Sequence, residues 1–316
     1  MNALLDVKHL SVAFGAYPVV RNLDLRIRHG RTFSLVGESG SGKSMTAFSI
    51  LRLVPHPGRI TDGSLLYQGT DLLSLDEAAM CRLRGRSIAM IFQEPMTSLN
   101  PVLRIGDQVA EPLRVHFGQS RREALDHARE LLTQVGIPSP LARLRDYPHQ
   151  LSGGMRQRVM IAMALACSPS LLLADEPTTA LDVTIQGQIL RLLKTLAEER
   201  NMGLLLITHD LGVVAEAADD VGVMYAGELV EQAPVHTFFA RPLHPYAHGL
   251  MSCAPTVDNR SQFRLTTISG SVPAPSRLPK GCTFRPRCPR AFERCGQVPP
   301  MLETETDHFV RCWLYI

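Results

Sequence analysis

The class of fold is decided by one stretch, Gly37-Glu38-Ser39-Gly40-Ser41-Gly42-Lys43-Ser44. It fits the pattern G-x-x-x-x-G-K-[ST], a glycine-rich loop whose backbone N–H groups surround phosphate oxygens. An apolar run over 32–36 precedes it and a helical pattern over 45–53 follows it, which is the strand–loop–helix context that the pattern requires. We therefore predict that these eight residues bind a nucleotide, with Lys43 reaching the β- and γ-phosphates and Ser44 ligating Mg²⁺.

A second chemical element follows the apolar run 171–174, where Asp175 and Glu176 stand together. In an open parallel sheet, ligands bind at the carboxyl ends of the strands. We expect Asp175 to help hold Mg²⁺, and Glu176 to orient and partly deprotonate the attacking water. With the phosphate loop, this pair predicts a nucleotide-hydrolysing enzyme. The Asn-Lys-x-Asp motif that reads guanine does not occur in the sequence, so ATP is favoured over GTP.

Strand-like and helix-like segments alternate along the first 240 residues. This order predicts an α/β fold with a mostly parallel sheet covered on both faces. The middle, about 94–160, reads as a helical insertion into that core. Proline becomes frequent after Arg241, which predicts an ATPase domain over 1–240 and a small Cys- and Pro-rich C-terminal domain over 241–316. The expected strands are 4–14, 23–28, 32–36, 87–92, 171–174, 204–208 and 221–225, and the expected helices include 121–135, 183–200 and 211–218.

The composition of the 316-residue chain is that of an ordinary globular protein, with 45% hydrophobic residues and a net charge of +3. That charge is too small to indicate nucleic acid as a partner. The longest apolar run, 159–167, is well short of the roughly 20 residues of a membrane span. Asp6 and Lys8 stand where a signal peptide would carry its apolar stretch. We therefore expect a chain that stays in the cytosol, where its seven cysteines remain reduced.

A second glycine-containing motif, LSGGMRQR, covers residues 151–158 and precedes a strongly helical run. Ser152, Gly153 and Gly154 at a helix N-terminus form an anion cradle without a lysine. One nucleotide does not need two cradles from one chain, so we expect a dimer in which this cradle closes on the partner's ATP. Taken alone, the motif would be an N-cap serine followed by flexible glycines.

LSGGMRQR resembles the signature of ABC ATPases, and the other motifs of that family are present in order. Gln93 in MIFQEP matches the Q-loop, Ala180-Leu181-Asp182 matches the D-loop, and His209 in LLITHD matches the switch histidine. Phe14 lies where the family places an aromatic ring against adenine. This resemblance covers about residues 4–235. The stretches QEPMTSLNP, YPHQLSGGM, ADEPTTALDVT, HPY and GCTFRPRCPRAFERC narrow it to the ATP-binding subunits of oligopeptide, dipeptide and nickel importers, nearest the dipeptide branch.

The resemblance implies a mechanism. Two ATPase subunits, either two copies of this chain or this chain and a homologous one, would close head to tail around two ATPs. Each ATP would lie between one chain's Lys43 loop and the other chain's signature. Gln93 would sense the γ-phosphate and join the Mg²⁺ shell, and Asp182 would contribute to the nucleotide site. Hydrolysis by Glu176, with His209 orienting the phosphate and water, would reset the pair.

The resemblance also implies partners. Two transmembrane permease subunits, and indirectly a solute-binding protein, would complete an importer of dipeptides or oligopeptides, with no role for nucleic acid. The chain would lie peripherally on the cytoplasmic face of the inner membrane. Nickel chelates or another small solute are the alternative cargo.

Four of the seven cysteines crowd the end of the chain: Cys282, Cys288, Cys295 and Cys312. Their gaps are wider than those of structural zinc sites and suit four thiolates converging on a [4Fe–4S] cluster, to which the family resemblance also points. Zn²⁺ is the alternative, and reduced thiols packed as small hydrophobic groups are a third possibility. A metal would help a segment with few apolar anchors to fold, so we expect a structural or sensing role. Local positive charge that could offset thiolates comes from Arg285, Arg287, Arg290 and Arg294.

Two other classes of function are open on the sequence. A chromosome-maintenance or DNA-repair ABC ATPase would need a long coiled coil between phosphate loop and signature, but only about a hundred residues separate Ser44 from Ser152. A metal- or redox-responsive regulatory module, with ATP secondary, would act through the C-terminal cysteines.

Overall fold

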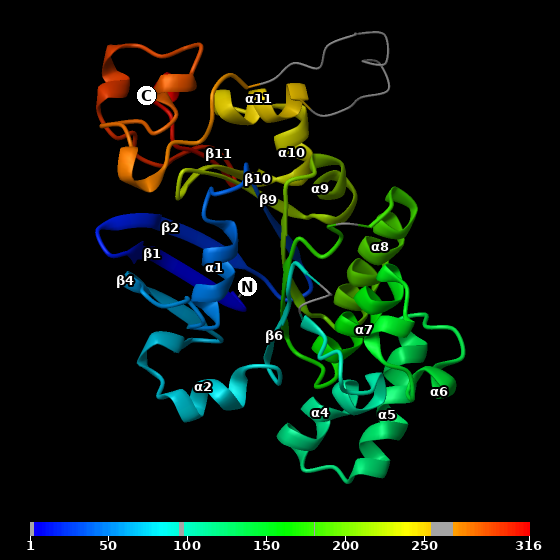
Figure 1. Cartoon of the computed structure of the whole chain (residues 1–316). Helices are drawn as coiled ribbons and strands as arrows, with labels where there is room; N and C mark the ends of the chain where they lie inside the picture. The colour runs from blue at the N-terminus through cyan, green and yellow to red at the C-terminus, as the bar shows by residue number, and fades with distance from the viewer. Residues whose placement is uncertain (1–2, 95–97, 180, 254–267) are drawn as a thin grey trace. The chain divides into compact units, whose positions relative to one another are not determined.

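The structure, a computed structural model, describes residues 3–94, 98–179, 181–253 and 268–316 (Figure 1). Within these ranges, every helix is too short or too polar to cross a lipid bilayer. The chain forms two compact units. Unit 1 contains Met1–Ile27, Phe33–Leu73 and Ile207–Ile316, and unit 2 contains Arg28–Thr32 and Ser74–Leu206.

Unit 1 begins with an antiparallel sheet. Its strands are β1 (Leu5–Phe14), β2 (Tyr17–Ile27), β4 (Gly58–Tyr67) and β5 (Thr70–Asp71). They lie in the order β2-β1-β4-β5. Along β1, Leu5 and Val7 are buried and, after a shift in register, so are Leu10 and Val12. This alternation of apolar and polar residues is what gives a strand one buried face.

A second group of strands in unit 1 leads into the phosphate loop and the C-terminal region. These strands are β3 (Thr32–Val36), whose first residue belongs to unit 2, β9 (Asp220–Tyr225), β10 (Glu228–Pro234), β12 (His308–Val310) and β11 (Leu302–Glu305). β3 pairs with β9 in parallel, whereas β9, β10, β12 and β11 are antiparallel neighbours in that order. The longer helices of the unit are α1 (Lys43–Ile50), α9 (Leu211–Ala217), α10 (Val235–Ala240) and α11 (Pro245–Cys253).

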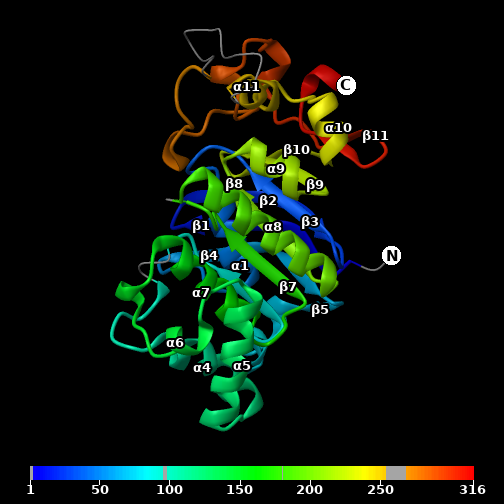
Figure 2. The same cartoon turned by 90° about the vertical axis from the view of Figure 1, so that its right-hand side faces the viewer.

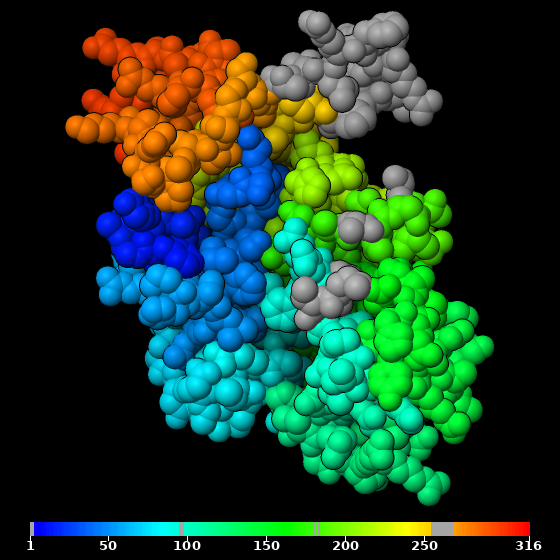
Figure 3. All heavy atoms as spheres, in the orientation of Figure 1, coloured from blue at the N-terminus to red at the C-terminus, as the bar shows by residue number. Residues whose placement is uncertain are grey.

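The core of unit 1 joins segments that are far apart in the sequence. Tyr225, Phe238, Tyr246 and Phe284 are all fully buried in one apolar cluster, and the ring centroids of Tyr225 and Phe284 lie 5.1 Å apart. Sequence patterning predicts few core residues beyond Arg241, but the structure differs because single aromatic rings, rather than a periodic pattern, anchor this region. Figure 3 shows the C-terminal region, in orange, lying against the blue N-terminal segment of the same unit.

Unit 2 combines short parallel strands with a group of helices (Figure 2). β6 (Ile88–Ile91) pairs in parallel with β7 (Leu171–Asp175), with Ile88 opposite Leu171. Next to β7 lies β8 (Gly203–Thr208), whose last two residues belong to unit 1. The helices are α2 (Glu77–Leu83), α4 (Ile105–Phe117), α5 (Arg121–Gln134), α6 (Pro140–Arg143), α7 (Gly153–Leu165) and α8 (Val183–Glu199). α4, α5 and α7 pack together in the stretch for which the sequence predicts helix.

α5 shows how local signals set the ends of a helix. Ser120 Oγ accepts a hydrogen bond from the N–H of Glu123, and Glu123 Oε2 accepts one from the N–H of Ser120, which together form a capping box. Ala124, Ala128 and Leu132 are buried at a spacing of four residues. The observed helix ends at Gln134, one residue before the end of the predicted range 121–135.

Candidate functional site

The phosphate loop predicted at residues 37–44 connects β3 to α1 in unit 1. Gly37 and Gly42 have φ angles of 152° and 103°, a region that residues with side chains rarely adopt. A Cβ atom on Gly37 would lie 2.1 Å from the carbonyl oxygen of Met224, and one on Gly42 would lie 2.6 Å from that of Val19. Both positions therefore require glycine, for conformation and for close packing.

The ammonium group of Lys43 lies over this loop, and the residue is only 5% exposed. Its Nζ donates hydrogen bonds to the carbonyl oxygens of Gly37 at 2.8 Å and Glu38 at 3.0 Å, and to Ser41 Oγ at 3.4 Å. α1 begins at Lys43 with no acidic residue in its first turn. A cation and a helix N-terminus thus converge on one loop, which is the electrostatic arrangement that binds phosphate.

Two further predicted residues belong to unit 1. His209 follows β8 and lines, with Gly37, a cavity of about 600 Å³ whose other walls come from α9, α10 and α11. Phe14 ends β1, and its half-buried ring packs on Gly58 so closely that a Cβ there would lie 2.6 Å from the ring. The unit therefore brings His209 near the start of the phosphate loop, whereas Phe14 lies at the end of a strand of the antiparallel sheet.

Glu176 and Gln93 meet in unit 2. Glu176 follows β7 with a φ of 45°, an unusual conformation for a residue other than glycine. Its Oε2 accepts hydrogen bonds from Gln93 Nε2 at 3.0 Å and from Thr179 Oγ1 at 2.9 Å, both uncharged donors. Asp175, at the end of β7, is 3% exposed. Sequence reasoning missed Thr179, and the signal that could have found it is its position three residues after the candidate base.

Two predicted residues of unit 2 cap helices. Ser152 Oγ accepts a hydrogen bond from the N–H of Met155 at 3.3 Å and caps α7. Asp182 Oδ1 accepts one from the N–H of Ile185 at 2.9 Å and caps α8. Ser152 is therefore an N-cap residue, which is the interpretation that the motif taken alone favours.

The glycines after Ser152 permit close packing between the starts of α7 and α8. A Cβ on Gly154 would lie 3.0 Å from Ile185, and one on Gly153 would lie 3.7 Å from Leu181. The predicted signature and D-loop are thus neighbours within unit 2. Ala180 of the D-loop lies outside the described residues.

The four C-terminal cysteines lie in unit 1 as free thiols. Burial raises the pKa of Cys282 to about 11, with smaller contributions from Cys295 and Cys312. Burial also raises the pKa of Cys288 and of Cys312, and here too neighbouring thiols contribute. Cys282, Cys288 and Cys312 are therefore each within electrostatic reach of Cys295. Among the described residues, however, no group of three or more His, Cys, Asp or Glu side chains is arranged to hold a metal ion.

The arginines expected to offset thiolate charge behave differently from one another. The charge of Arg290 opposes the effect of burial on the pKa of Cys288 and of Cys312. The guanidinium of Arg294 lies 4.0 Å from the ring centroid of Trp313. Arg287 instead donates hydrogen bonds to the carboxylate of Glu38 in the phosphate loop.

Comparison with known proteins assigns the family. A family model described as "ABC transporter" matches residues 20–179, and one described as "Oligopeptide/dipeptide transporter, C-terminal region" matches residues 230–295. The oligopeptide transport ATP-binding protein AppD of Bacillus subtilis is 52% identical over 321 residues, covering 100% of this chain and 98% of AppD. The chain belongs to the ATP-binding subunits of oligopeptide/dipeptide ABC importers.

Other members of this family are similar over nearly the full length. The dipeptide transport ATP-binding protein DppD of Haemophilus influenzae is 49% identical over 314 residues, covering 98% of this chain and 95% of DppD. The oligopeptide transport ATP-binding protein OppD of Salmonella typhimurium is 49% identical over 304 residues, covering 95% of this chain and 90% of OppD.

Solved structures share the fold. The dimeric structure of MJ0796, a bacterial ABC transporter cassette, matches with a TM-score of 0.66 and 30% identity, over 73% of this chain and 98% of that one. CbiO1 of Clostridium perfringens matches with a TM-score of 0.67 and 24% identity, over 76% of this chain and 92% of that one. The ABC-type α/β fold is confirmed. As a member of this family, the chain binds ATP and hydrolyses it in transport.

The C-terminal region of this ABC ATPase contains the sequence His244-Pro245-Tyr246, which reaches the phosphate loop. The N–H of His244 donates to Glu231 Oε2 at 2.7 Å, and the N–H of Tyr246 donates to His244 Nδ1 at 3.1 Å. The hydroxyl oxygen of Tyr246 then accepts a hydrogen bond from the N–H of Glu38 at 2.9 Å. Sequence reasoning used HPY only as a family marker and missed this contact.

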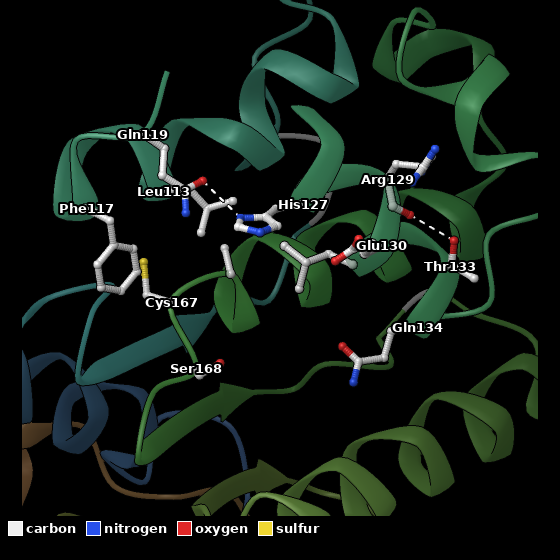
Figure 4. Close-up of a pocket in the computed structure, with 12 residues that line it drawn as sticks. Leu113, Phe117, Gln119, His127, Arg129, Glu130, Thr133, Gln134, Cys167 and Ser168 are labelled. Carbon is white, nitrogen blue, oxygen red and sulfur yellow. Dashed lines mark hydrogen bonds between the residues drawn. The ribbon is translucent and has the colours of Figure 1, made fainter. Parts of the chain in front are cut away.

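A cavity of about 820 Å³ in unit 2 carries none of the predicted site residues (Figure 4). It lies beside α5, where His127 Nδ1 is 3.0 Å from Gln119 Oε1. Burial raises the pKa of Cys167 on its wall to about 11, so this thiol is protonated at neutral pH and is a poor nucleophile. The cavity therefore offers no cysteine nucleophile for ATP chemistry.

Proposed function

We propose that this ABC ATPase powers the import of dipeptides or oligopeptides across the cytoplasmic membrane. The observation that carries the proposal is the match of residues 230–295 to the C-terminal region of oligopeptide/dipeptide transporters. The similarity along nearly the whole chain to AppD and OppD, named for oligopeptide transport, and to DppD, named for dipeptide transport, supports it.

In this mechanism the loop at 37–44 binds the triphosphate through its N–H groups and the Lys43 ammonium, and Phe14 contacts the adenine. Ser44, Asp175 and Gln93 supply a hydroxyl, a carboxylate and an amide oxygen, which are donors of the kind that Mg²⁺ prefers. When bound, Mg²⁺ supplies positive charge to the phosphate oxygens.

Glu176 is the general base in this mechanism. Its carboxylate accepts the proton of the attacking water, while Gln93 and Thr179 hold Oε2 in a fixed orientation. His209 donates a hydrogen bond to the γ-phosphate. The division of roles rests on chemistry, because the carboxylate can accept a proton and the imidazole can donate one.

The chain acts as one half of a pair of ATPase subunits in this proposal. Ser152, Gly153 and Gly154 contact the partner's ATP, and Asp182 lies beside it. The dimeric structure of the related cassette MJ0796 supports this arrangement. The pair consists of two copies of this chain or of this chain and a homologous one. It acts from the cytoplasmic face of the membrane on two permease subunits, which receive their solute from a solute-binding protein.

The proposal divides the chain into an ATPase domain of residues 1–240, with a helical subdomain at about 94–160, and a C-terminal domain of residues 241–316. In this proposal the C-terminal domain holds a [4Fe–4S] cluster. Cys295 and Cys312 are buried and Cys282 and Cys288 are half-buried. Cys295 helps to raise the pKa of each of the other three thiols, which supports a shared ligand. They must draw together on binding, since they form no ready ligand set. Iron and sulfide analysis, with an absorption spectrum of anaerobically purified protein, tests this. If the purified protein is colourless and contains stoichiometric zinc, the metal at these cysteines is Zn²⁺ and not an iron–sulfur cluster.

The function is tested by co-purifying the chain with its permease subunits and reconstituting the complex in proteoliposomes. We expect a binding protein loaded with peptide to stimulate ATP hydrolysis and peptide uptake, and a matched complex with Glu176→Gln to show neither. Stimulation by nickel chelates, with no response to peptides, would overturn the peptide assignment.

A further inference from the structure

Glu38 places a negative charge in a loop that binds a polyanion. It is the acidic member of GESGSGKS, and an uncompensated carboxylate beside the triphosphate would repel it. Within unit 1, two residues of the C-terminal region contact Glu38, one at its side chain and one at its backbone.

The side-chain contact is an ion pair with Arg287. Arg287 Nη1 donates to Glu38 Oε1 at 2.9 Å and to Oε2 at 3.2 Å. The Arg287 side chain is 6% exposed and that of Glu38 is 30% exposed, so the pair is largely shielded from water. A shielded, charge-assisted hydrogen bond is stronger than a surface pair and less sensitive to salt.

The rest of the guanidinium of Arg287 is anchored independently of Glu38. Its Nε donates to the carbonyl oxygen of Ser269 at 2.8 Å, and Nη2 lies 3.3 Å from the carbonyl oxygen of Gly270. The group also lies 5.7 Å from the ring centroid of Tyr225. Burial lowers the pKa of Arg287, but its hydrogen bonds to Glu38 and Tyr225 outweigh burial and raise it. The cation is therefore held in place before any nucleotide binds.

The backbone contact comes from Tyr246, whose buried hydroxyl accepts the N–H of Glu38 at 2.9 Å. Tyr246 is itself fixed by the hydrogen bond between its N–H and His244. The C-terminal region thus holds the second residue of the phosphate loop at both its backbone and its carboxylate.

We propose that the C-terminal region sets the affinity of the phosphate loop for ATP, because Arg287 neutralises Glu38 and, with Tyr246, positions the loop. Arg287 is a positioning residue that acts through Glu38. The proposal rests on ATP binding by this loop and needs no metal at the cysteines. Because Arg287 immediately precedes Cys288, a rearrangement of the cysteine segment reaches the ATP site through the same contact.

A charge cycle on the purified full-length chain tests the proposal, with equilibrium binding of a non-hydrolysable ATP analogue as the readout. We expect Arg287→Ala to weaken binding about tenfold, because it leaves the carboxylate uncompensated. Glu38→Gln should change affinity in the opposite direction, tightening binding by up to about threefold. The double variant should return to within about threefold of the wild type.

The matched control is Arg277→Ala, an exposed arginine of the same region, which should change affinity less than about twofold. If Arg287→Ala does not fold, the sign of the Glu38→Gln effect still decides, since that variant leaves Arg287 intact. A double variant that binds as weakly as Arg287→Ala, or a single Arg287→Ala variant with wild-type affinity, would overturn the proposal. Failure of the wild type to bind the analogue would instead count against the ATPase assignment itself.

Discussion

Unit 1 and unit 2 each present a glutamate at a nucleotide motif, and the two glutamates have hydrogen-bond partners of different kinds. Glu38, in the phosphate loop, forms an ion pair with the buried cation of Arg287. Glu176, after β7, accepts hydrogen bonds from the uncharged groups of Gln93 and Thr179. The contact of Glu38 compensates a charge, and the contacts of Glu176 with Gln93 and Thr179 orient a carboxylate through uncharged donors.

The difference teaches that partners, and not residue type, separate a structural carboxylate from a reactive one. A carboxylate that must accept a proton should keep its negative charge and a fixed direction. A carboxylate beside a bound polyanion should have its charge cancelled. Four substitutions can break or sharpen this contrast.

The largest effect is expected from Glu176→Gln. Loss of the proton acceptor should lower kcat for ATP hydrolysis by about 100-fold or more, while ATP binding changes little. Phosphate release and analogue binding measure the two quantities on the same samples. Glu198→Gln, an exposed glutamate of α8, is the matched control. Turnover near the wild-type rate would remove Glu176 from the role of base.

Gly37→Ala should be next, because its Cβ would lie 2.1 Å from the carbonyl oxygen of Met224. Backbone would have to shift around the residue that precedes Glu38, and we expect ATP binding to weaken by about tenfold or more. Gly40→Ala is the matched variant, since Gly40 also has a positive φ, of 77°, but open space around its Cβ. Equal losses in both variants would show that close packing at Gly37 is not the cause.

The support beneath Tyr246 predicts a pH dependence of stability. Burial lowers the pKa of His244 to about 3, with a smaller effect of His248. In the unfolded chain a histidine titrates near 6.5, so protons bind the unfolded state first as the pH falls. This contribution to the free energy of unfolding is complete above pH ~6.5 and decreases by roughly 1.4 kcal/mol per pH unit toward pH ~3.

Urea unfolding of the full chain at a series of pH values measures this slope. His244→Asn should flatten it, because asparagine does not titrate. His236→Asn, at an exposed position on α10, should leave it as in the wild type. A slope that is the same in all three proteins would contradict the assignment to His244.

The smallest effect is expected from Thr179→Val, which keeps the shape of the side chain and removes the hydroxyl that donates to Glu176. We expect kcat to fall about three- to fivefold with little change in the KM for ATP, because one orienting hydrogen bond contributes about 1 kcal/mol. Thr184→Val, at an exposed position on α8, is the control. A change in KM alone would place Thr179 in nucleotide binding instead.

Much of the α/β core was predictable because its strands are nearly continuous apolar runs. β3 agrees with the predicted range, and α5 differs from its range by one residue. β10 was missed because Glu228 and Glu231 resemble surface residues in the sequence, yet they are 7% and 0% exposed. Glu231 Oε1 lies 2.9 Å from His308 Nε2, a partner far away in the chain. Long-range partners make such buried charges possible, and no local pattern reveals them.

The sequence by itself determined the phosphate loop, the family and the identity of the residues predicted to act on ATP, because backbone conformation and contiguous motifs carry that information. Only the tertiary structure decided which groups surround each of these residues. In the folded chain Gln93 and Thr179 donate hydrogen bonds to Glu176, and Arg287 of the cysteine segment donates one to Glu38. The physical reason is that the charge and orientation of a side chain are set by groups that folding brings within a few ångströms, whatever their distance along the chain.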